Sequence, residues 1–242
     1  MKKRLFCILS LYLLIPFSFA SGPQLSDTLR GVQARGELRC GQDAAAHLAQ
    51  QSPDGLSDFY TAFCRALAIV VLGDSEAVSY VSVAGDEHVF ALSQNNLDIL
   101  FGDVTEAAYH QQVALGPVIF YGATERYGPI MRAEDEVWFK LVNWLVYALI
   151  QAEEWGVDSQ NIGEIASAVQ DAVALERFLA EPAAAQLGLE PGALSRAIAE
   201  VGNYGEIYER YLGLQTGHSL PRGPNRLWLD GGELYALPFG LE

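Results

Sequence analysis

A long amphipathic segment in the middle of the chain gives the clearest pattern of apolar and polar positions. Residues 127–156 combine a short extended run with a stretch in which apolar residues recur at steps of three and four: Trp138, Leu141, Val142, Leu145, Leu149 and Ala152. Asp135 and Glu136 place negative charge at the start of this stretch, and Gly156 can supply the left-handed residue that ends it. The pattern predicts the longest helix of the protein, with one face buried.

Strand-like and helix-like patterns alternate before this helix. Such alternation is typical of a parallel α/β sheet with right-handed crossovers, in which ligands bind beyond the carboxyl ends of the strands. Residues 42–43 and 102–105 are therefore expected at the binding mouth. The expected elements are a helix from the capping residue Ser26 to Gly36, a strand over 37–41, a helix from Phe59 to Gly73, a strand over 78–83, a short helix over 86–94 and a strand over 97–101.

Two further extended runs, 117–121 and 126–131, are separated only by the four residues Gly122 to Glu125. So short a connection predicts a β-hairpin or a tight reversal. Beyond the long helix, helical periods return before a tail rich in Gly and Pro that begins at Gly213. These helical periods cover 161–170, 172–179 and 194–212, with breaks at Pro182 and at Pro191 and Gly192.

The first twenty residues have the three parts of an export signal. Lys2, Lys3 and Arg4 are basic, residues 5–17 are apolar, and residues 18–20 form a small-x-small cleavage site. Cys7 lies too early for lipid attachment at that site. We therefore expect an exported, soluble, periplasmic chain of residues 21–242 with no membrane insertion, since Lys140 and Asn143 interrupt the best candidate for a membrane span.

The chain is strongly acidic. It has 15 Lys and Arg against 30 Asp and Glu, which gives a formal charge of −15. The only charged residues in the export signal are basic, so its cleavage would make the chain still more acidic. Such a chain repels nucleic acid and anionic lipid, which excludes both as partners.

Cys40 and Cys64 are the only cysteines beyond the signal. An even pair in an oxidising compartment favours a disulfide between them, and the alternative is two buried free thiols.

The signatures of catalysis and of metal binding are missing from the sequence. His47, His88, His110 and His218 have no Cys, Asp or Glu at metal-ligand spacing. There is no nucleophile elbow, phosphate-cradling glycine loop or dinucleotide fingerprint. The many carboxylates are typical of solvated surface groups. The sequence therefore predicts a protein that is not an enzyme and carries no cofactor and no metal.

Several segments together resemble the periplasmic amino-acid-binding proteins of ABC transporters, specifically solute-binding family 3 of the general L-amino-acid type. The resemblance covers both ends of the mature chain. The matching segments are Thr28-Leu29, Ala34-Arg35-Gly36, Cys40-Gly41, the run from Phe63 to Ala68, Gly73-Asp74, Tyr127-Gly128-Pro129, Trp138-Phe139, the helix end from Ala148 to Gly156, the run from Val201 to Glu206, Leu227-Trp228 and Asp230-Gly231-Gly232.

The resemblance implies that a whole lobe is missing. In that family the chain leaves the first lobe through a hinge strand, builds a second lobe and returns through another hinge strand. Here 117–121 resembles the outgoing strand and 126–131 the returning one, with only four residues between them. The implied fold is α/β, a single lobe of a periplasmic-binding-protein-like fold (type II), with a mainly parallel sheet flanked by helices and extra C-terminal helices. One domain, 21–242, would hold the first lobe over 25–121 and the return strand and C-terminal helices over 126–242.

The family's ligand positions are altered here. Its first helix opens with a Gly-Phe-Asp pattern, and Tyr60 stands where that aspartate would lie. Its carboxylate-gripping arginines align with Gly102 and His110, neither of which can replace a guanidinium fork. Each candidate residue can also be read as plain loop polarity. The candidate ligand-binding residues are Asp43, Asp58, Tyr60, Asp103, Thr105 and His110.

Three functions follow from this resemblance as hypotheses. The first is a solute-binding component that takes an amino acid or another small molecule and works with an ABC permease. The second is a single-lobed interaction module that docks another periplasmic protein or its own copy. The third, a dehydratase of related fold, is disfavoured because it needs an enclosed cleft around an acid–base carboxylate.

Overall fold

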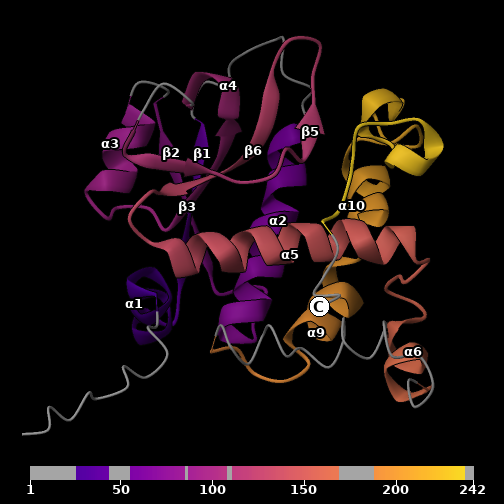
Figure 1. The fold of residues 1–242 in the computed structure, drawn as a ribbon, viewed down its shortest axis with the longest axis horizontal. Coiled ribbons are helices and arrows are strands. Elements are labelled where there is room, and N and C mark those ends of the chain that lie inside the picture. The colour runs from indigo at the N-terminus through magenta and orange to yellow at the C-terminus, as the bar shows by residue number, and fades with distance from the viewer. Residues whose placement is uncertain (1–25, 44–54, 85–86, 108–110, 169–187, 238–242) are drawn as a thin grey trace, which may run out of the picture.

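The computed structural model describes residues 26–43, 55–84, 87–107, 111–168 and 188–237. The expected export signal, the expected helix over 172–179 and the candidate ligand residue His110 lie outside these ranges. A mixed sheet occupies one half of the molecule, and the long helix α5 (Glu136–Glu154) runs across it, with α1, α9 and α6 on the other side of α5 (Figure 1).

The elements follow the expected alternation of strands and helices. The other helices are α1 (Asp27–Arg35), α2 (Leu56–Leu72), α3 (His88–Ser93), α4 (Val104–Ala107), α6 (Ile162–Ala168), α9 (Ala193–Val201) and α10 (Tyr204–Tyr211). The strands are β1 (Leu38–Asp43), β2 (Val78–Val83), β3 (Ile99–Asp103), β4 (Val113–Leu115), β5 (Phe120–Tyr121) and β6 (Arg126–Arg132). Two short 3-10 turns, η2 (Gly223–Asn225) and η3 (Trp228–Asp230), lie in the tail.

The sheet has the order β2-β1-β3-β6-β4, and β5 also pairs with β6. β1 is parallel to β2 and β3, whereas β6 is antiparallel to β3, β4 and β5. Five of the described strands therefore share one direction and β6 alone runs the other way. This arrangement confirms the predicted α/β class with a mainly parallel strand direction.

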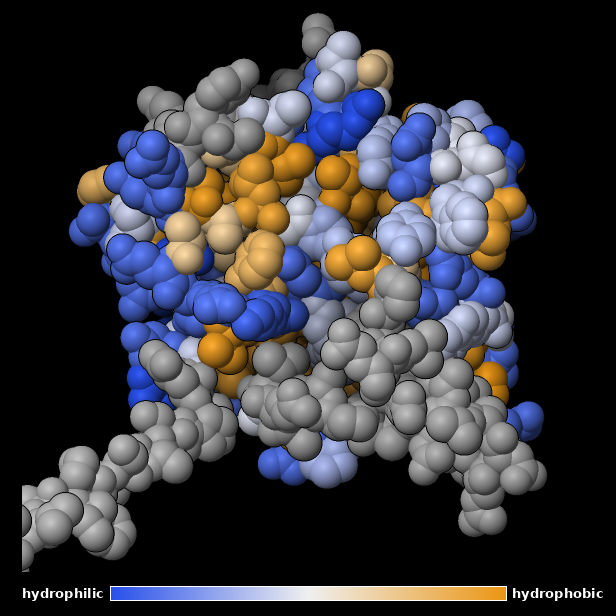
Figure 2. All heavy atoms as spheres, viewed as in Figure 1, coloured by the Kyte–Doolittle hydropathy of each residue, from blue (hydrophilic) through white to orange (hydrophobic). Residues whose placement is uncertain are grey.

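Two apolar clusters cover the two faces of the sheet. Phe101 belongs to the larger cluster with α2, α5, α9 and α10, while its neighbour Leu100 belongs to a smaller one with α3 and α4. Successive strand residues point to opposite faces, so the two clusters lie on opposite sides of the sheet. On the face seen in Figure 2, apolar side chains reach the surface above α5 and are bordered by hydrophilic ones.

Local capping explains where the principal helices begin and end. Ser26 accepts a hydrogen bond from the Leu29 N–H at the start of α1, and Asp135 accepts one from the Trp138 N–H at the start of α5. Gly36, at φ 69°, takes the left-handed conformation that ends α1. These starts agree with the pattern-based prediction for both helices.

The predicted hairpin is confirmed, with a shorter first strand. The Gly122 N–H donates to the Glu125 carbonyl at 3.1 Å, and Tyr121 pairs with Arg126. Only Phe120 and Tyr121 of the predicted run 117–121 form a strand. The third parallel strand is displaced two residues from the predicted 97–101, and β4 was not predicted.

Residues 194–212 were predicted as one helical segment, and this prediction is wrong because two separate helices form there. Gly202, at φ 94°, leaves the helical conformation after α9. Asn203 then caps α10 by accepting from the Glu206 N–H, while the Glu206 side chain accepts from the Asn203 N–H. The chain therefore turns between two separate helices.

Candidate functional site

The carboxyl ends of the parallel strands meet at one edge of the sheet, which we call the mouth. β1 ends at Asp43, opposite Val83 of β2, and β3 ends at Asp103. α2 begins beside this edge, and α4 with the β5–β6 hairpin borders it (Figure 1). The backbone positions of Asp43 and Asp103 thus agree with the predicted mouth.

Asp103 and Thr105, both candidate ligand residues, lie in direct contact at the mouth. The Thr105 N–H donates to Asp103 Oδ1 at 2.8 Å, and the Thr105 hydroxyl donates to the same oxygen. Asp103 is half-buried and Thr105 is exposed at the start of α4. The pair presents a carboxylate and a hydroxyl at the edge of the sheet, the kinds of group that bind an ammonium or a hydroxyl of a solute.

Tyr60 belongs to the aromatic wall behind the mouth. Its ring stacks on Phe101 with centroids 5.9 Å apart, and it lies 6.0 Å from the ring of Tyr127. It is buried, whereas Asp58, two residues earlier on α2, is exposed. The structure therefore joins Tyr60 to the sheet but places Asp58 on the outer surface, and ligand roles for both remain predictions.

The hairpin forms one side of the mouth. Tyr127 of β6 lies directly opposite Asp103 of β3, and on its other side it pairs with Phe120 of β5. The Phe120 ring lies 6.0 Å from that of Tyr127 and 6.3 Å from that of Phe59. The position of the hairpin therefore determines where Tyr127 lies beside Asp103.

Every arginine in the described ranges already donates a hydrogen bond within the protein. Arg126, at the base of the hairpin, donates to the Gly122 and Glu125 carbonyls and lies 5.1 Å over the Tyr121 ring. Arg35 and Arg39 are paired with Asp98 at the start of β3, away from the mouth. A solute carboxylate at the mouth would therefore have to compete with existing partners of these cations.

Cys40 of β1 and Cys64 of α2 form the predicted disulfide. Their Cα atoms are 6.3 Å apart, and both residues are buried. The bond closes the segment that carries Asp43, Asp58 and Tyr60. It therefore ties the middle of α2 to the strand whose carboxyl end forms the mouth.

Sequence analysis did not single out a partly buried cluster that joins the tail to the hairpin. We call Glu153, Arg222, Asn225 and Tyr121 the tail anchor. Arg222 Nη2 donates to Glu153 Oε2 at 3.0 Å, and the same guanidinium donates to the Asn225 carbonyl. The Asn225 side chain in turn hydrogen-bonds the Tyr121 backbone. These partners are 69 and 104 residues apart, so no local pattern reveals them.

Electrostatics strengthens this cluster. Burial disfavours the Arg222 cation, but the hydrogen bonds and charge of Glu153 outweigh it and raise the pKa of Arg222. Burial also disfavours the charged form of Tyr204, and it therefore raises the pKa of that hydroxyl well above its ordinary value. The Tyr204 hydroxyl therefore stays protonated and donates to the Ile119 carbonyl at 2.8 Å.

The described ranges also bear on metal binding and on membrane insertion. No group of His, Cys, Asp and Glu in these ranges could hold a metal ion. None of the helices described is both long enough and apolar enough to cross a bilayer.

Comparison with known proteins identifies relatives of one kind. No protein-family profile matches the chain. It is 25% identical over 328 residues to the glutamate/glutamine/aspartate/asparagine-binding protein BztA of Rhodobacter capsulatus, which covers 92% of this chain and 96% of that protein. It is 38% identical over 118 residues to the general L-amino acid-binding periplasmic protein AapJ of Rhizobium johnstonii, covering 47% of this chain but only 34% of that protein. The alignment with BztA is longer than the 242 residues of this chain, so BztA has residues without a counterpart here.

A solved structure shows the same fold. The ABC transporter periplasmic binding protein from Brucella ovis, with glutathione bound, superposes with a TM-score of 0.68 at 22% sequence identity. The match covers 88% of this chain and 99% of that one. The fold described above is therefore that of periplasmic binding proteins.

Proposed function

Because the homologues of this chain are amino-acid-binding periplasmic proteins of ABC transporters, we propose that it is a periplasmic solute-binding component reduced to one lobe. The four-residue turn over 122–125 carries this proposal, since it joins β5 and β6 where the family resemblance implies an entire second lobe. In this proposal the first lobe spans 25–121, and the return strand and C-terminal helices span 126–242. The export signal over 1–20 would deliver the chain to the periplasm.

Two further observations support the loss of a lobe. Phe120 pairs with Tyr127 and Tyr121 with Arg126, so the strands stay in register up to the turn. The alignment with BztA is longer than this chain, as expected where a relative has an inserted lobe. An inserted lobe enters and leaves at neighbouring points, so its loss can leave a compact remainder.

The mouth then offers one wall of a site instead of two. Small-molecule sites bury most of their ligand between walls, and an open wall gives weak binding. Asp103, Thr105 and the edge of Tyr127 would contact the solute, with Asp43 and His110 as further candidates. We propose that the protein binds amino acids or related small molecules weakly and is not an enzyme.

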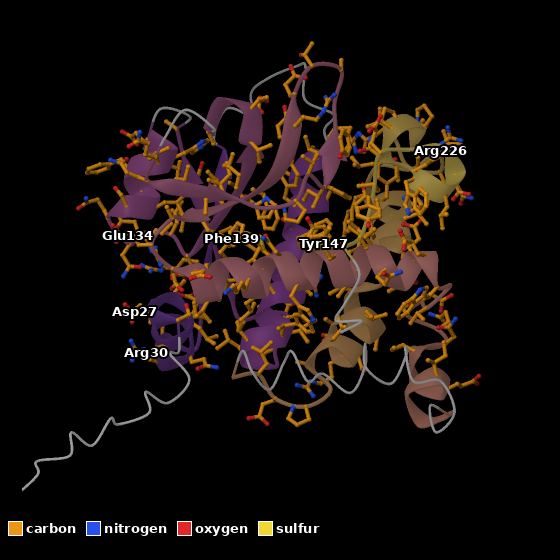
Figure 3. The ribbon with its side chains drawn as sticks, in the orientation of Figure 1. Asp27, Arg30, Glu134, Phe139, Tyr147 and Arg226 are labelled. Carbon is orange, nitrogen blue, oxygen red and sulfur yellow. A yellow bond between two sulfur atoms is a disulfide. The ribbon has the colours of Figure 1, made fainter. Side chains whose placement is uncertain are left out.

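Titration calorimetry on residues 21–242 tests this function. The panel is the twenty amino acids and glutathione, which is bound in the Brucella protein of the same fold. We expect dissociation constants of about 0.1 mM or weaker, and a further loss in Asp103→Asn and Thr105→Ala. Asp27→Asn is the control, because Asp27 lies on α1 far from the mouth (Figure 3).

Two results would contradict the proposal. No heat across the panel would remove solute binding as the function. Dissociation constants of about 1 µM or tighter would show an enclosed site, contrary to a single open lobe.

A second function is favoured by the surface of the tail. Trp228, Leu229, Tyr235 and Leu237 are large apolar residues with about half of their surface exposed, and the rings of Trp228 and Tyr235 lie 6.0 Å apart. Exposed apolar patches mark interaction sites. The chain would then be a single-lobed protein-interaction module with no transport role. Cross-linking in the periplasm and sedimentation of the purified chain test it. A monomer that captures no protein would remove this alternative.

A further inference from the structure

The side chain of Asn225 pairs with the backbone of Tyr121 as a neighbouring strand would. Its Oδ1 accepts from the Tyr121 N–H at 2.6 Å, and its Nδ2 donates to the Tyr121 carbonyl at 3.2 Å. Asn225 is only 3% exposed. Among the described strands, β5 pairs with β6 alone, so Asn225 completes the other side of β5 at Tyr121.

Asn225 is itself held in place by a partly buried ion pair. Arg222 Nε and Nη2 donate to the Asn225 carbonyl at 3.0 and 2.9 Å, and the same guanidinium is paired with Glu153 on α5. The guanidinium lies 5.4 Å from the ring centroids of both Tyr204 and Tyr208. The tail therefore presents the Asn225 amide from a rigid base.

A second bond holds the residue just before β5. The Tyr204 hydroxyl of α10 donates to the Ile119 carbonyl at 2.8 Å, and the Tyr121 hydroxyl contacts the Glu233 carbonyl at 3.4 Å. The hairpin is thus fastened on its outer side by α10 and the tail. A strand fastened in this way cannot act as a hinge without breaking these bonds.

The fastening reaches the mouth through the strand register. Tyr121 pairs with Arg126 and Phe120 with Tyr127, and Tyr127 lies opposite Asp103. A shift of β5 would therefore move Tyr127 relative to Asp103.

We propose that Asn225 is a positioning residue that fixes the β5–β6 hairpin as a rigid wall of the mouth. The importance of that wall for solutes rests on the function proposed above, whereas the fastening itself does not. Hinge strands must be able to move, whereas the fastening by Asn225 holds the hairpin in one orientation. Solute binding at the mouth would then occur without closure of the hairpin.

Amide hydrogen exchange on residues 21–242, measured without solute, tests the fastening. In Asn225→Ala we expect the Tyr121 amide to exchange at least about 10-fold faster, relative to the amides of α5, than in the unaltered chain. Asn225→Asp keeps an acceptor for the Tyr121 N–H, so protection of that amide should be largely retained. This second variant keeps the proposal testable if Asn225→Ala does not fold.

Asn203→Ala is the matched control. Asn203 is also a buried asparagine, caps α10 and donates to the Val157 carbonyl at 2.8 Å, but none of its hydrogen bonds within the described residues reaches the hairpin. Loss of the Asn203 side chain should lower the overall free energy of unfolding without a selective rise in the exchange rate of the Tyr121 amide. The proposal is overturned if Tyr121 exchange is unchanged in Asn225→Ala, equally fast in Asn203→Ala, or as fast in Asn225→Asp as in Asn225→Ala. Because no solute is present, these results are independent of whether the mouth binds one.

Discussion

Gly102 of β3 lies directly opposite Gly128 of β6, close to the mouth. The two glycines differ in the space around them. A Cβ added at Gly128 would lie 2.6 Å from the Pro117 carbonyl oxygen, which belongs to backbone that runs alongside β6. A Cβ at Gly102 would meet only side chains, the nearest being Ile130 Cδ1 at 3.4 Å. Gly128 is therefore required for the close approach of the 116–119 segment, and Gly102 is not.

Gly128→Ala is expected to be much more destabilising than Gly102→Ala. The new methyl group at position 128 must displace backbone, which costs about 2 kcal/mol, whereas the one at position 102 meets ordinary van der Waals neighbours and should cost about 0.5 kcal/mol. Urea unfolding of both variants measures the difference. Equal losses of unfolding free energy in the two variants would contradict the close approach of the Pro117 backbone to Gly128.

The sequence was sufficient for elements whose periodicity is local. The stripe from Trp138 to Ala152 and the negative charge of Asp135 predicted α5, and the capping residue Ser26 predicted α1, because those signals lie within or next to the elements themselves. It was not sufficient for β4, whose three residues follow no long alternation and become a strand only by pairing with Met131 and its neighbours. The break at Gly202 was also missed, because the apolar period continues across it from α9 into α10.

The candidate site was predictable only in part. The predicted strand ends gave the backbone placement of Asp43 and Asp103, whereas the hydrogen bond between Thr105 and Asp103 was found only in the structure. The burial of Tyr60 against Phe101 depends on how α2 packs on the sheet, which sequence spacing does not contain. The tail anchor joins residues 69 and 104 positions apart, so only the folded chain reveals it.

Loss of the Glu153 carboxylate should destabilise the protein strongly. Arg222 and Glu153 have only 17% and 16% of their side-chain surface exposed, so Glu153→Gln leaves a largely buried guanidinium without its counter-charge. We expect a loss of about 3 kcal/mol in the free energy of unfolding. The double variant Glu153→Gln/Arg222→Gln should lose less than the sum of the single losses, as urea unfolding in a double-mutant cycle would measure.

The exposed pair between Glu136 and Lys140 is the control for that cycle. These side chains are 76% and 62% exposed, so solvent screens the pair and Glu136→Gln should leave the free energy of unfolding nearly unchanged. If Glu153→Gln had an equally small effect on the free energy of unfolding, the tail would not be anchored through the ion pair between Arg222 and Glu153.

The Cys40–Cys64 disulfide should contribute substantially to stability. It joins residues 24 positions apart and so restricts the unfolded chain, which is worth about 3 kcal/mol for a loop of this size. The double variant Cys40→Ser/Cys64→Ser should lose about that amount in urea unfolding. The unaltered chain, unfolded with and without reductant, provides the comparison, and coincident curves would contradict a bond in the folded protein.

Stability should fall in acid partly through Asp135. Burial alone would raise the pKa of this carboxyl, but hydrogen bonds from Ser26, Thr28 and Trp138 outweigh it and lower the pKa below its usual 3.8. A carboxyl whose pKa is lower in the folded state binds its proton more weakly there. Its stabilisation is therefore complete above about pH 4 and is lost as the pH falls through the folded-state pKa. Urea unfolding of Asp135→Asn should show a deficit of about 1 kcal/mol at pH 6 that shrinks below pH 4. Asp27→Asn, at an exposed position of α1, should parallel the unaltered chain, and a deficit in Asp135→Asn that stays constant down to pH 2.5 would contradict the assignment.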